Sequence, residues 1–331
     1  MLTQPSDRPL PSRYEPARHS SSKLAPPTFV SRSAAMREML EHAELFARAD
    51  VTVLIEGATG TGKAYVAQHI HMMSPRCAAE FRYANAGAMD DPLAGSDLFG
   101  HARGSFTGAS QHRAGCLASA NGGTVFLDEI GKASKAVQAK LLHVIEHGEF
   151  CALGEDRPRV VNVRFVAAAS EGLGRLVAAG LFLEDLRQRL CGFRLVVPEL
   201  RNRREDIPEL IEQFAWVHAA RHGYEHGPPV FDAAVVRAMV KAPWPGNMRQ
   251  LSDAVELAIM FARGASRVTL AHCRGDLGYL VDLGRKRPRQ EDSTLAEALE
   301  RAGGNKSEAA RMVGVCRSTI HRRIKSSDKR P

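Results

Sequence analysis

Residues 51–63 read Val51-Thr-Val-Leu-Ile-Glu-Gly57-Ala-Thr-Gly-Thr-Gly-Lys63, an apolar, β-branched run that ends in a glycine-rich segment. The run predicts a short buried strand, and the residues from Tyr65 to Met72 predict a helix after it. The spacing G-x-x-x-x-G-K between a strand and a helix is typical of a phosphate-binding loop. Glycine lets backbone amides wrap around phosphate, and the helix N-terminus favours negative charge. A plain glycine-rich turn is the alternative.

The loop predicts a nucleotide site in which Lys63 reaches the β- and γ-phosphates. The residue after Lys63 in such loops is usually Ser or Thr, which would ligate magnesium, but here it is Ala64. The residues predicted to contact nucleotide at this loop are Gly57, Ala58, Thr59, Gly60, Thr61, Gly62, Lys63 and Ala64.

A second strand candidate, Thr124-Val-Phe-Leu-Asp128-Glu129, ends in two carboxylates. A carboxylate at the end of a strand beside a phosphate-binding loop can hold Mg²⁺, and the next one can activate the attacking water. We therefore predict Asp128 as the metal ligand and Glu129 as the general base, with a solvated loop as the alternative. Together the two motifs imply Mg²⁺-dependent hydrolysis of a nucleoside triphosphate.

Strand and helix candidates alternate through the first 200 residues. Strands are predicted at 51–55, 124–127 and 161–168, and helices from about residue 31 and over 135–146. This alternation predicts an α/β fold with a parallel sheet covered by helices on both faces. Residues 206–219, 231–242 and 247–263 form three amphipathic patterns without intervening strands, which predicts a small helical domain.

Composition and charge restrict the function classes. The 331 residues are 44% hydrophobic and 25% charged, which is ordinary for a globular protein and excludes wholesale disorder. Six scattered cysteines show neither metal-ligand spacing nor a disulfide framework, which favours a reducing cytoplasm. No apolar run is long enough to span a membrane, and the N-terminus has no signal-peptide pattern.

The net charge of +8 is concentrated near the C-terminus. Residues 285–331 contain 13 Lys and Arg against 6 Asp and Glu, whereas residues 1–284 contain 32 against 31. A basic terminal block on a nearly neutral body indicates a nucleic-acid contact, and a solvated basic tail is the alternative.

With these motifs, about residues 28–328 resemble the AAA+ bacterial enhancer-binding proteins that activate sigma-54 RNA polymerase. The most specific match is Asp97-Leu-Phe-Gly-His-Ala-Arg-Gly104-Ser-Phe-Thr-Gly-Ala109, which is similar to the family's GAFTGA loop. In the family this loop contacts sigma-54 and moves with the nucleotide state. A phenylalanine between glycines suits an apolar anchor at a mobile tip, and a hairpin turn with a buried phenylalanine is the alternative. The resemblance implies sigma-54 contacts at Gly104, Ser105, Phe106, Thr107, Gly108 and Ala109.

Three further residues are carried over singly from the resemblance. Asn85 is similar to the switch residue that restrains the catalytic glutamate, and a polar turn residue is the alternative. Arg189 is similar to an arginine finger that reaches a neighbouring subunit's γ-phosphate, and a surface salt bridge is the alternative. Arg249, in Trp244-Pro-Gly-Asn-Met-Arg249, resembles the nucleotide-contacting arginine of the sensor II motif, and packing within the lid is the alternative.

Besides Ser105, which replaces the first alanine of the GAFTGA loop, the sequence departs from the family pattern at three places. Ala64 stands where the family usually has an acidic residue, and Leu183 stands where one of two finger arginines is expected. The sensor I position, usually Thr-Asn, is Ala169-Ser170, and Arg187 is a candidate substitute finger. These departures predict weak hydrolysis by this chain alone and a need for a second, related subunit.

The segment from Gly304 to Lys325 resembles a Fis-type helix-turn-helix. Asn305 suits the N-cap of the first helix and Gly314 suits the turn. One face of the second helix is apolar and the opposite face polar, as in a recognition helix that enters the major groove; a solvated helical face is the alternative. A dimer on a palindromic site is expected. The predicted DNA contacts are Arg317, Ser318, Thr319, His321, Arg322, Arg323 and Lys325.

The resulting organisation has five segments: a disordered leader (1–27), an α/β ATPase core (28–200), a helical lid (201–275), a basic linker (276–292) and a helix-turn-helix domain (293–328). The phosphate-binding loop starts so early that no N-terminal regulatory domain is expected. Control is then expected from a regulatory protein acting in trans, from expression level or from hetero-assembly. In this design the chain resembles two groups of short family members, the regulators of type III secretion genes and those of phage-shock genes, and it is more similar to the first group.

The expected function is an ATP-hydrolysing transcriptional activator that binds double-stranded enhancer DNA and remodels sigma-54 RNA polymerase holoenzyme to open promoter complexes. The family resemblance implies a hexamer, either homo- or hetero-oligomeric. One alternative is a DNA-binding co-regulator with a weak or degenerate ATPase in a hetero-oligomer. Another is a AAA+ motor that remodels DNA or proteins, against which the Phe106 loop and the helix-turn-helix argue.

Overall fold

The computed structural model describes residues 31–87, 91–105 and 109–273. The predicted leader, basic linker and helix-turn-helix domain lie outside the described residues, as do all the predicted DNA contacts from Arg317 to Lys325 and the loop residues 106–108. No helix in the described ranges is long and apolar enough to cross a membrane.

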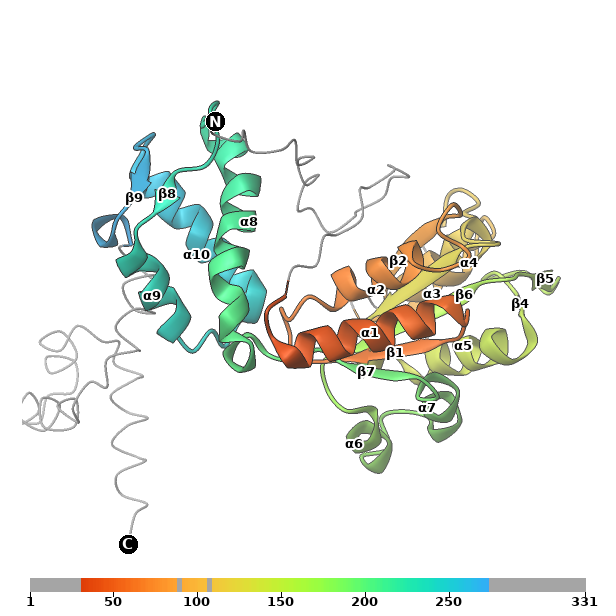
Figure 1. Cartoon of the computed structure of the whole chain (residues 1–331). Helices are drawn as coiled ribbons and strands as arrows, with labels where there is room; N and C mark the ends of the chain where they lie inside the picture. Colours follow the sequence, from red (N-terminus) through yellow and green to blue (C-terminus); the bar gives the residue numbers. More distant parts are fainter. Residues whose placement is uncertain (1–30, 88–90, 106–108, 274–331) are drawn as a thin grey trace, which may run out of the picture. The chain divides into compact units, whose positions relative to one another are not determined.

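A five-stranded parallel sheet forms the centre of the core, with strand order β2-β3-β6-β1-β7 (Figure 1). Its strands are β1 (Val53–Glu56), β2 (Phe81–Asn85), β3 (Thr124–Asp128), β6 (Arg164–Ala169) and β7 (Arg194–Val196). Because all five strands run in the same direction, their carboxyl ends meet at one edge. There Asn85 lies opposite Asp128, and Glu56 lies opposite Ala169. The three strands nearest the centre were predicted from their apolar runs, whereas the two edge strands were not.

Helices cover both faces of the sheet, which confirms the predicted α/β architecture (Figure 1). Each face of the sheet has its own apolar core, and successive residues of β1 point into opposite cores. Val53 and Ile55 pack with α1 and α2 on one face. Leu54 packs on the other face, in the cluster that includes α3, α4, α5 and α7. The helices of the core are α1 (Ala34–Arg48), α2 (Lys63–Met72), α3 (Asp91–Phe99), α4 (Gly115–Ser119), α5 (Lys135–His147), α6 (Leu173–Ala178) and α7 (Glu184–Leu190), with a 3-10 turn η1 (Ile130–Lys132).

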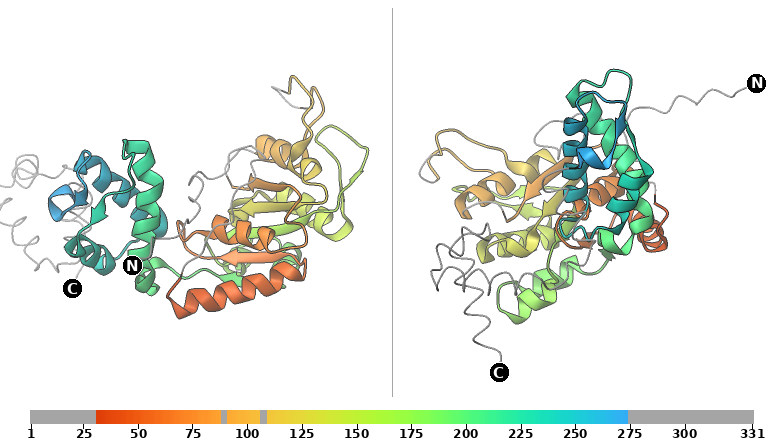
Figure 2. Two further views of the ribbon diagram at one scale, coloured as in Figure 1. Left: turned by 45° about the horizontal axis from the view of Figure 1, so that its top comes forward. Right: turned by 90° about the vertical axis from the view of Figure 1, so that its left-hand side faces the viewer.

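The helical lid forms a separate group of helices in the ribbon diagram (Figure 2). It has its own apolar core, which includes Trp244, Leu251 and Phe214. Its helices are α8 (Ile207–Ala219), α9 (Ala233–Lys241) and α10 (Asn247–Ala262), and its 3-10 turns are η2 (Leu200–Asn202), η3 (Arg204–Asp206), η4 (Ala220–His222) and η5 (Leu270–His272). The expectation of no strands was wrong, because β8 (Val230–Phe231) pairs in parallel with β9 (Arg267–Val268). Two-residue strands leave too short an alternating pattern to be recognised in a sequence.

Candidate functional site

The phosphate-binding loop, residues 57–63, connects β1 to α2. Gly60 and Gly62 have φ angles of 80° and 100°, in the left-handed region that residues with a side chain rarely adopt. A Cβ atom on Gly60 would also lie 2.3 Å from the carbonyl oxygen of Gly246 in the lid. Backbone geometry and lack of space therefore both require glycine at position 60.

Lys63 folds back over this loop and is buried. Its Nζ donates hydrogen bonds to the carbonyl oxygens of Gly57 at 2.8 Å and Ala58 at 3.4 Å. Burial lowers the pKa of Lys63, and the nearby carboxylates of Glu129 and Asp128 oppose that effect. The ammonium group is therefore held at the loop and close to both predicted catalytic carboxylates.

The Asp128 side chain is oriented by two donors. One of its oxygens accepts a hydrogen bond from the Glu129 amide at 3.0 Å, and the other accepts one from the Tyr83 hydroxyl at 3.0 Å. Burial, followed by the charge of Asp128, raises the pKa of Tyr83, so this hydroxyl remains a donor. A single oriented carboxylate fits Mg²⁺, which proteins hold through one or two carboxylates plus substrate phosphates. Within the described ranges no cluster of three or more His, Cys, Asp or Glu suits a metal ion.

Glu129 follows β3 with a left-handed φ of 52°. Its Oε2 accepts a hydrogen bond from the Ser170 hydroxyl at 2.7 Å and lies 3.4 Å from Nζ of Lys132. Burial acts to raise the pKa of Glu129, but the Ser170 hydrogen bond and the charges of Lys132 and Lys63 outweigh it, so the pKa is lowered. The carboxyl is therefore ionised at neutral pH, the state that a general base requires.

The structure does not bring the Asn85 side chain to Glu129. Asn85 ends β2 beside Asp128, but its amide oxygen accepts a hydrogen bond from the Gly87 amide at 3.0 Å. The contact to Glu129 that the family resemblance assigned to Asn85 is made here by Ser170. The sequence marked Ser170 as a departure from the sensor I pattern, but gave no sign of its partner.

The two candidate finger arginines differ in exposure. The Arg189 side chain is 59% exposed, and its Nε donates to Glu146 at 2.8 Å. Arg187 is 34% exposed and pairs within its own helix with Glu184, whose pKa its hydrogen bond lowers to about 2. Leu183 packs against the core and donates its amide to Gln138. Arg189 is thus more available to a neighbouring subunit than Arg187.

The predicted sensor II arginine, Arg249, is exposed in the first turn of α10 and lies close enough to Lys63 to lower its pKa. No role was predicted from the sequence for the neighbouring Asn247, which is 1% exposed. The Asn247 amide nitrogen donates to the Thr59 carbonyl at 3.0 Å, and its amide oxygen accepts from the Leu200 amide at 2.9 Å. The only sequence feature that pointed to Asn247 was its place in the Trp244-Pro-Gly-Asn247 motif.

The predicted sigma-54 loop begins in a hairpin between α3 and α4. His101 bridges Arg113 in antiparallel fashion and Leu153 in parallel fashion. The Gly104 amide then donates to the Ala109 carbonyl at 2.8 Å. The structure therefore describes the base of the loop, whereas Phe106, Thr107 and Gly108 lie outside the described residues.

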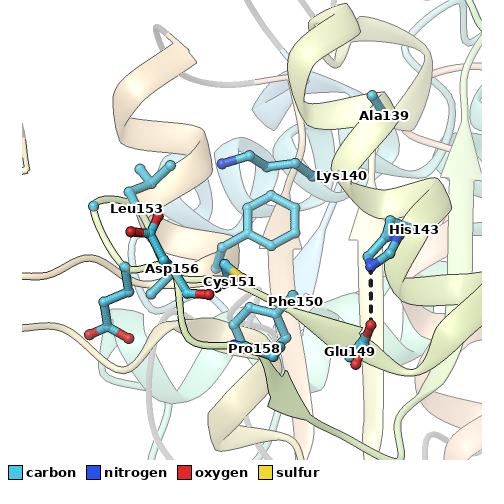
Figure 3. A pocket seen from close by; sticks show the side chains of 13 residues that line it. Ala139, Lys140, His143, Glu149, Phe150, Cys151, Leu153, Asp156 and Pro158 are labelled. Atoms are coloured by element: carbon cyan, nitrogen blue, oxygen red, sulfur yellow. Dashed lines mark hydrogen bonds and ion pairs between the residues drawn. The ribbon is translucent and has the colours of Figure 1, made fainter.

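A cavity of about 600 Å³ adjoins this base, between α5 and the hairpin formed by β4 (Glu149–Phe150) and β5 (Arg159–Val160) (Figure 3). Its wall includes the Phe99 ring, with Nζ of Lys140 5.5 Å from the ring centroid, and a His143–Glu149 pair at 3.6 Å. No residue of the phosphate-binding loop lines it, so the cavity is separate from the predicted nucleotide site.

Comparison with known families identifies the three parts of the chain. The sigma-54 interaction domain matches residues 29–196. The chain belongs to the sigma-54 activator family. The AAA+ ATPase lid domain matches residues 201–279, and the Fis-family bacterial regulatory domain matches residues 286–326. The family has a AAA+ ATPase core, a lid and a helix-turn-helix, as the resemblance implied.

Relatives of known name support this assignment. The transcriptional regulatory protein ZraR of Klebsiella oxytoca is 38% identical over 305 residues, which cover 88% of this chain and 67% of ZraR. GlrR of Escherichia coli is 36% identical, covering 97% of this chain and 74% of GlrR. Among solved structures, NtrX from Brucella abortus in complex with ATP superposes with a TM-score of 0.68 at 32% identity, covering 90% of this chain and 68% of NtrX.

Proposed function

We propose that this sigma-54 activator hydrolyses ATP and uses the resulting conformational change to remodel sigma-54 RNA polymerase at promoters. The observation that carries the proposal is the meeting of Lys63, Asp128 and Glu129 beside the phosphate-binding loop, at the carboxyl edge of the sheet. The same core carries the hairpin base of the sigma-54 loop.

The residues of this site have distinct chemical roles in the proposal. Loop amides and Lys63 bind the β- and γ-phosphates. Asp128 would hold Mg²⁺, and the ion would supply positive charge at the phosphates. Glu129 accepts a proton from the water that attacks the γ-phosphorus, while the bond to the β-phosphate oxygen breaks and ADP leaves. Arg189 acts on a neighbouring subunit's γ-phosphate, and Arg249 contacts nucleotide from the lid.

The partners follow from the remaining segments. The loop Gly104–Ala109 contacts sigma-54, with Phe106 as its apolar anchor, and the C-terminal helices bind double-stranded enhancer DNA in the cytoplasm. Removal of the chain beyond residue 284 is expected to abolish salt-sensitive DNA binding, because 13 Lys and Arg lie in that segment. Binding isotherms at several salt concentrations, with ATP turnover as the control for an intact body, test this expectation. Equal DNA affinity of the truncated chain would contradict it.

Assembly decides between the leading function and its alternative, a DNA-binding co-regulator with a weak ATPase in a hetero-oligomer. A finger that acts across a subunit boundary makes turnover per subunit rise with protein concentration. With Leu183 in place of one finger, we expect a low rate from the pure chain that a related subunit increases. Turnover measured against concentration, alone and with such a subunit, tests this. A brisk, self-cooperative rate from the pure chain would exclude dependence on a partner.

A further inference from the structure

Three successive carbonyl oxygens at the centre of the phosphate-binding loop are held by the lid. The carbonyl of Thr59 accepts from the Asn247 side chain at 3.0 Å, that of Gly60 from the Met248 amide at 2.9 Å, and that of Thr61 from Nη2 of Arg203 at 2.8 Å. In contrast, within the described residues, the loop amides that donate to no protein acceptor include those of Thr59, Gly60, Gly62 and Lys63. The loop's acceptors are therefore occupied from outside, while its donors stay available for phosphate.

Asn247 is fixed in place for this contact. It is 1% exposed and has a φ of 53°, a left-handed conformation that asparagine tolerates better than most residues. Its amide oxygen accepts from the Leu200 amide at 2.9 Å, so both ends of the side chain are used. The side chain therefore has little freedom to leave Thr59 while the lid remains docked.

Arg203 makes the second side-chain contact from an unusual environment. Its side chain is 3% exposed, and its Nε has no hydrogen-bond partner. The nearby Asp206 instead accepts from the Ser31 hydroxyl and from the amides of Arg32 and Ser33. A buried guanidinium without a bonded carboxylate is costly. The Arg203 guanidinium donates to the Thr61 carbonyl at 2.8 Å and to the Met36 sulfur at 3.4 Å, so the shorter of these two hydrogen bonds goes to the phosphate-binding loop.

We propose that Asn247 and Arg203 are positioning residues that keep the loop's carbonyl dipoles turned away from bound phosphate. Because carbonyl oxygens repel phosphate, a loop released from the lid binds nucleotide more weakly. Lid docking thereby sets the affinity of the phosphate-binding loop, although neither residue needs to touch nucleotide. This inference rests on the proposed nucleotide site. It also predicts that the lid holds the loop in the protein without nucleotide.

The variant Asn247→Asp removes the donor to Thr59 and adds a negative charge near the phosphate site, so loop exchange without nucleotide, rather than affinity, reports the lost contact alone. Aspartate tolerates the same backbone conformation and keeps an acceptor for the Leu200 amide, but it loses the donor to Thr59. Without nucleotide, we expect faster amide hydrogen exchange in the peptide that spans residues 57–63 and unchanged exchange in α9. Affinity for a fluorescent ADP analogue should fall roughly fivefold to tenfold, the effect of one lost hydrogen bond.

Ser252→Ala is the matched control, because Ser252 lies on the same helix as Asn247, α10. The substitution removes a buried 2.9 Å hydrogen bond to His218 of α8 without touching the loop. It should leave loop exchange and nucleotide affinity unchanged. Arg203→Met is the second test variant, since an apolar side chain can replace a buried charge without loss of folding. It should show the same two changes as Asn247→Asp.

The two measurements separate failure of this inference from failure of the proposed function. If the wild type bound no nucleotide, the proposed ATPase would be wrong, yet exchange in residues 57–63 would still report whether the lid holds the loop. Wild-type loop exchange and wild-type ADP affinity in both folded variants would overturn the inference. Accelerated loop exchange with weakened affinity, absent from Ser252→Ala, would support it.

Discussion

Replacement of Glu129 by glutamine is expected to lower kcat for ATP hydrolysis by about 10²- to 10⁴-fold, the usual contribution of a general base. In the wild type the Ser170 hydroxyl donates a hydrogen bond to the Glu129 carboxylate at 2.7 Å. Glutamine keeps an oxygen that can accept this hydrogen bond. It cannot take a proton from water. Because Lys63 and the loop amides are unchanged, the Kd for ATP should stay near that of the wild type. Single-turnover phosphate release and equilibrium nucleotide binding measure the two quantities separately.

Ser170→Ala is the companion variant, because the Ser170 hydrogen bond is one of the interactions that lower the pKa of Glu129. A base acts while ionised, so activity is lost as pH falls through its pKa. Loss of the hydrogen bond raises that pKa, and the acid limb of the pH–rate profile should move to higher pH. Ser170→Thr retains the hydroxyl and should restore the profile. Near-normal turnover in Glu129→Gln would remove Glu129 from the role of base.

Phe106→Ala is expected to abolish promoter opening while ATP hydrolysis and DNA binding persist. The proposed anchor is a single aromatic side chain at the tip of the loop, and one such side chain often supplies most of the binding energy at an interface. The proposed catalytic residues lie at the carboxyl edge of the sheet, and this substitution leaves them unchanged. Open-complex formation and phosphate release, measured in the same reaction, test the separation.

The matched control for Phe106→Ala is Leu45→Ala, which also truncates a large apolar side chain and lies on α1 with 63% exposure. It should behave as the wild type in both assays. Promoter opening by Phe106→Ala at the wild-type rate would assign the sigma-54 contact to another surface, and loss of ATP turnover would give Phe106 a role in the core.

Local patterns predicted the centre of the fold well. The first four residues of strand β3 are buried. A strand buried on both faces needs a continuous apolar run, and that run is easily recognised in the sequence. The edge strand β2 has the half-exposed pattern of Phe81–Asn85, and β7 spans three residues, so neither gave a clear signal. Edge strands bury fewer side chains, and the periodicity that identifies strands weakens accordingly.

Candidate site residues could be predicted from the sequence where they belong to a contiguous motif. Residues that reach the site only through tertiary contacts could not be predicted. Spacing alone identified Lys63 and the Asp128-Glu129 pair. The contact between Glu129 and Ser170 joins residues 41 positions apart, and that between Thr59 and Asn247 joins residues 188 apart. Neither partner can be chosen from one sequence, because serine and asparagine are also common in turns.

Open-complex formation on a duplex sigma-54 promoter shows whether this chain is an ATP-driven activator of sigma-54 polymerase. The full chain is added with ATP, sigma-54 holoenzyme and enhancer DNA at a concentration that saturates its ATPase, with a related subunit included in a parallel reaction. We predict opening that requires hydrolysable ATP and is lost in Lys63→Ala. If the wild type failed to open the promoter in either reaction, the chain would not be an activator of sigma-54 polymerase. If Lys63→Ala opened it equally well, opening would not depend on the proposed ATPase site.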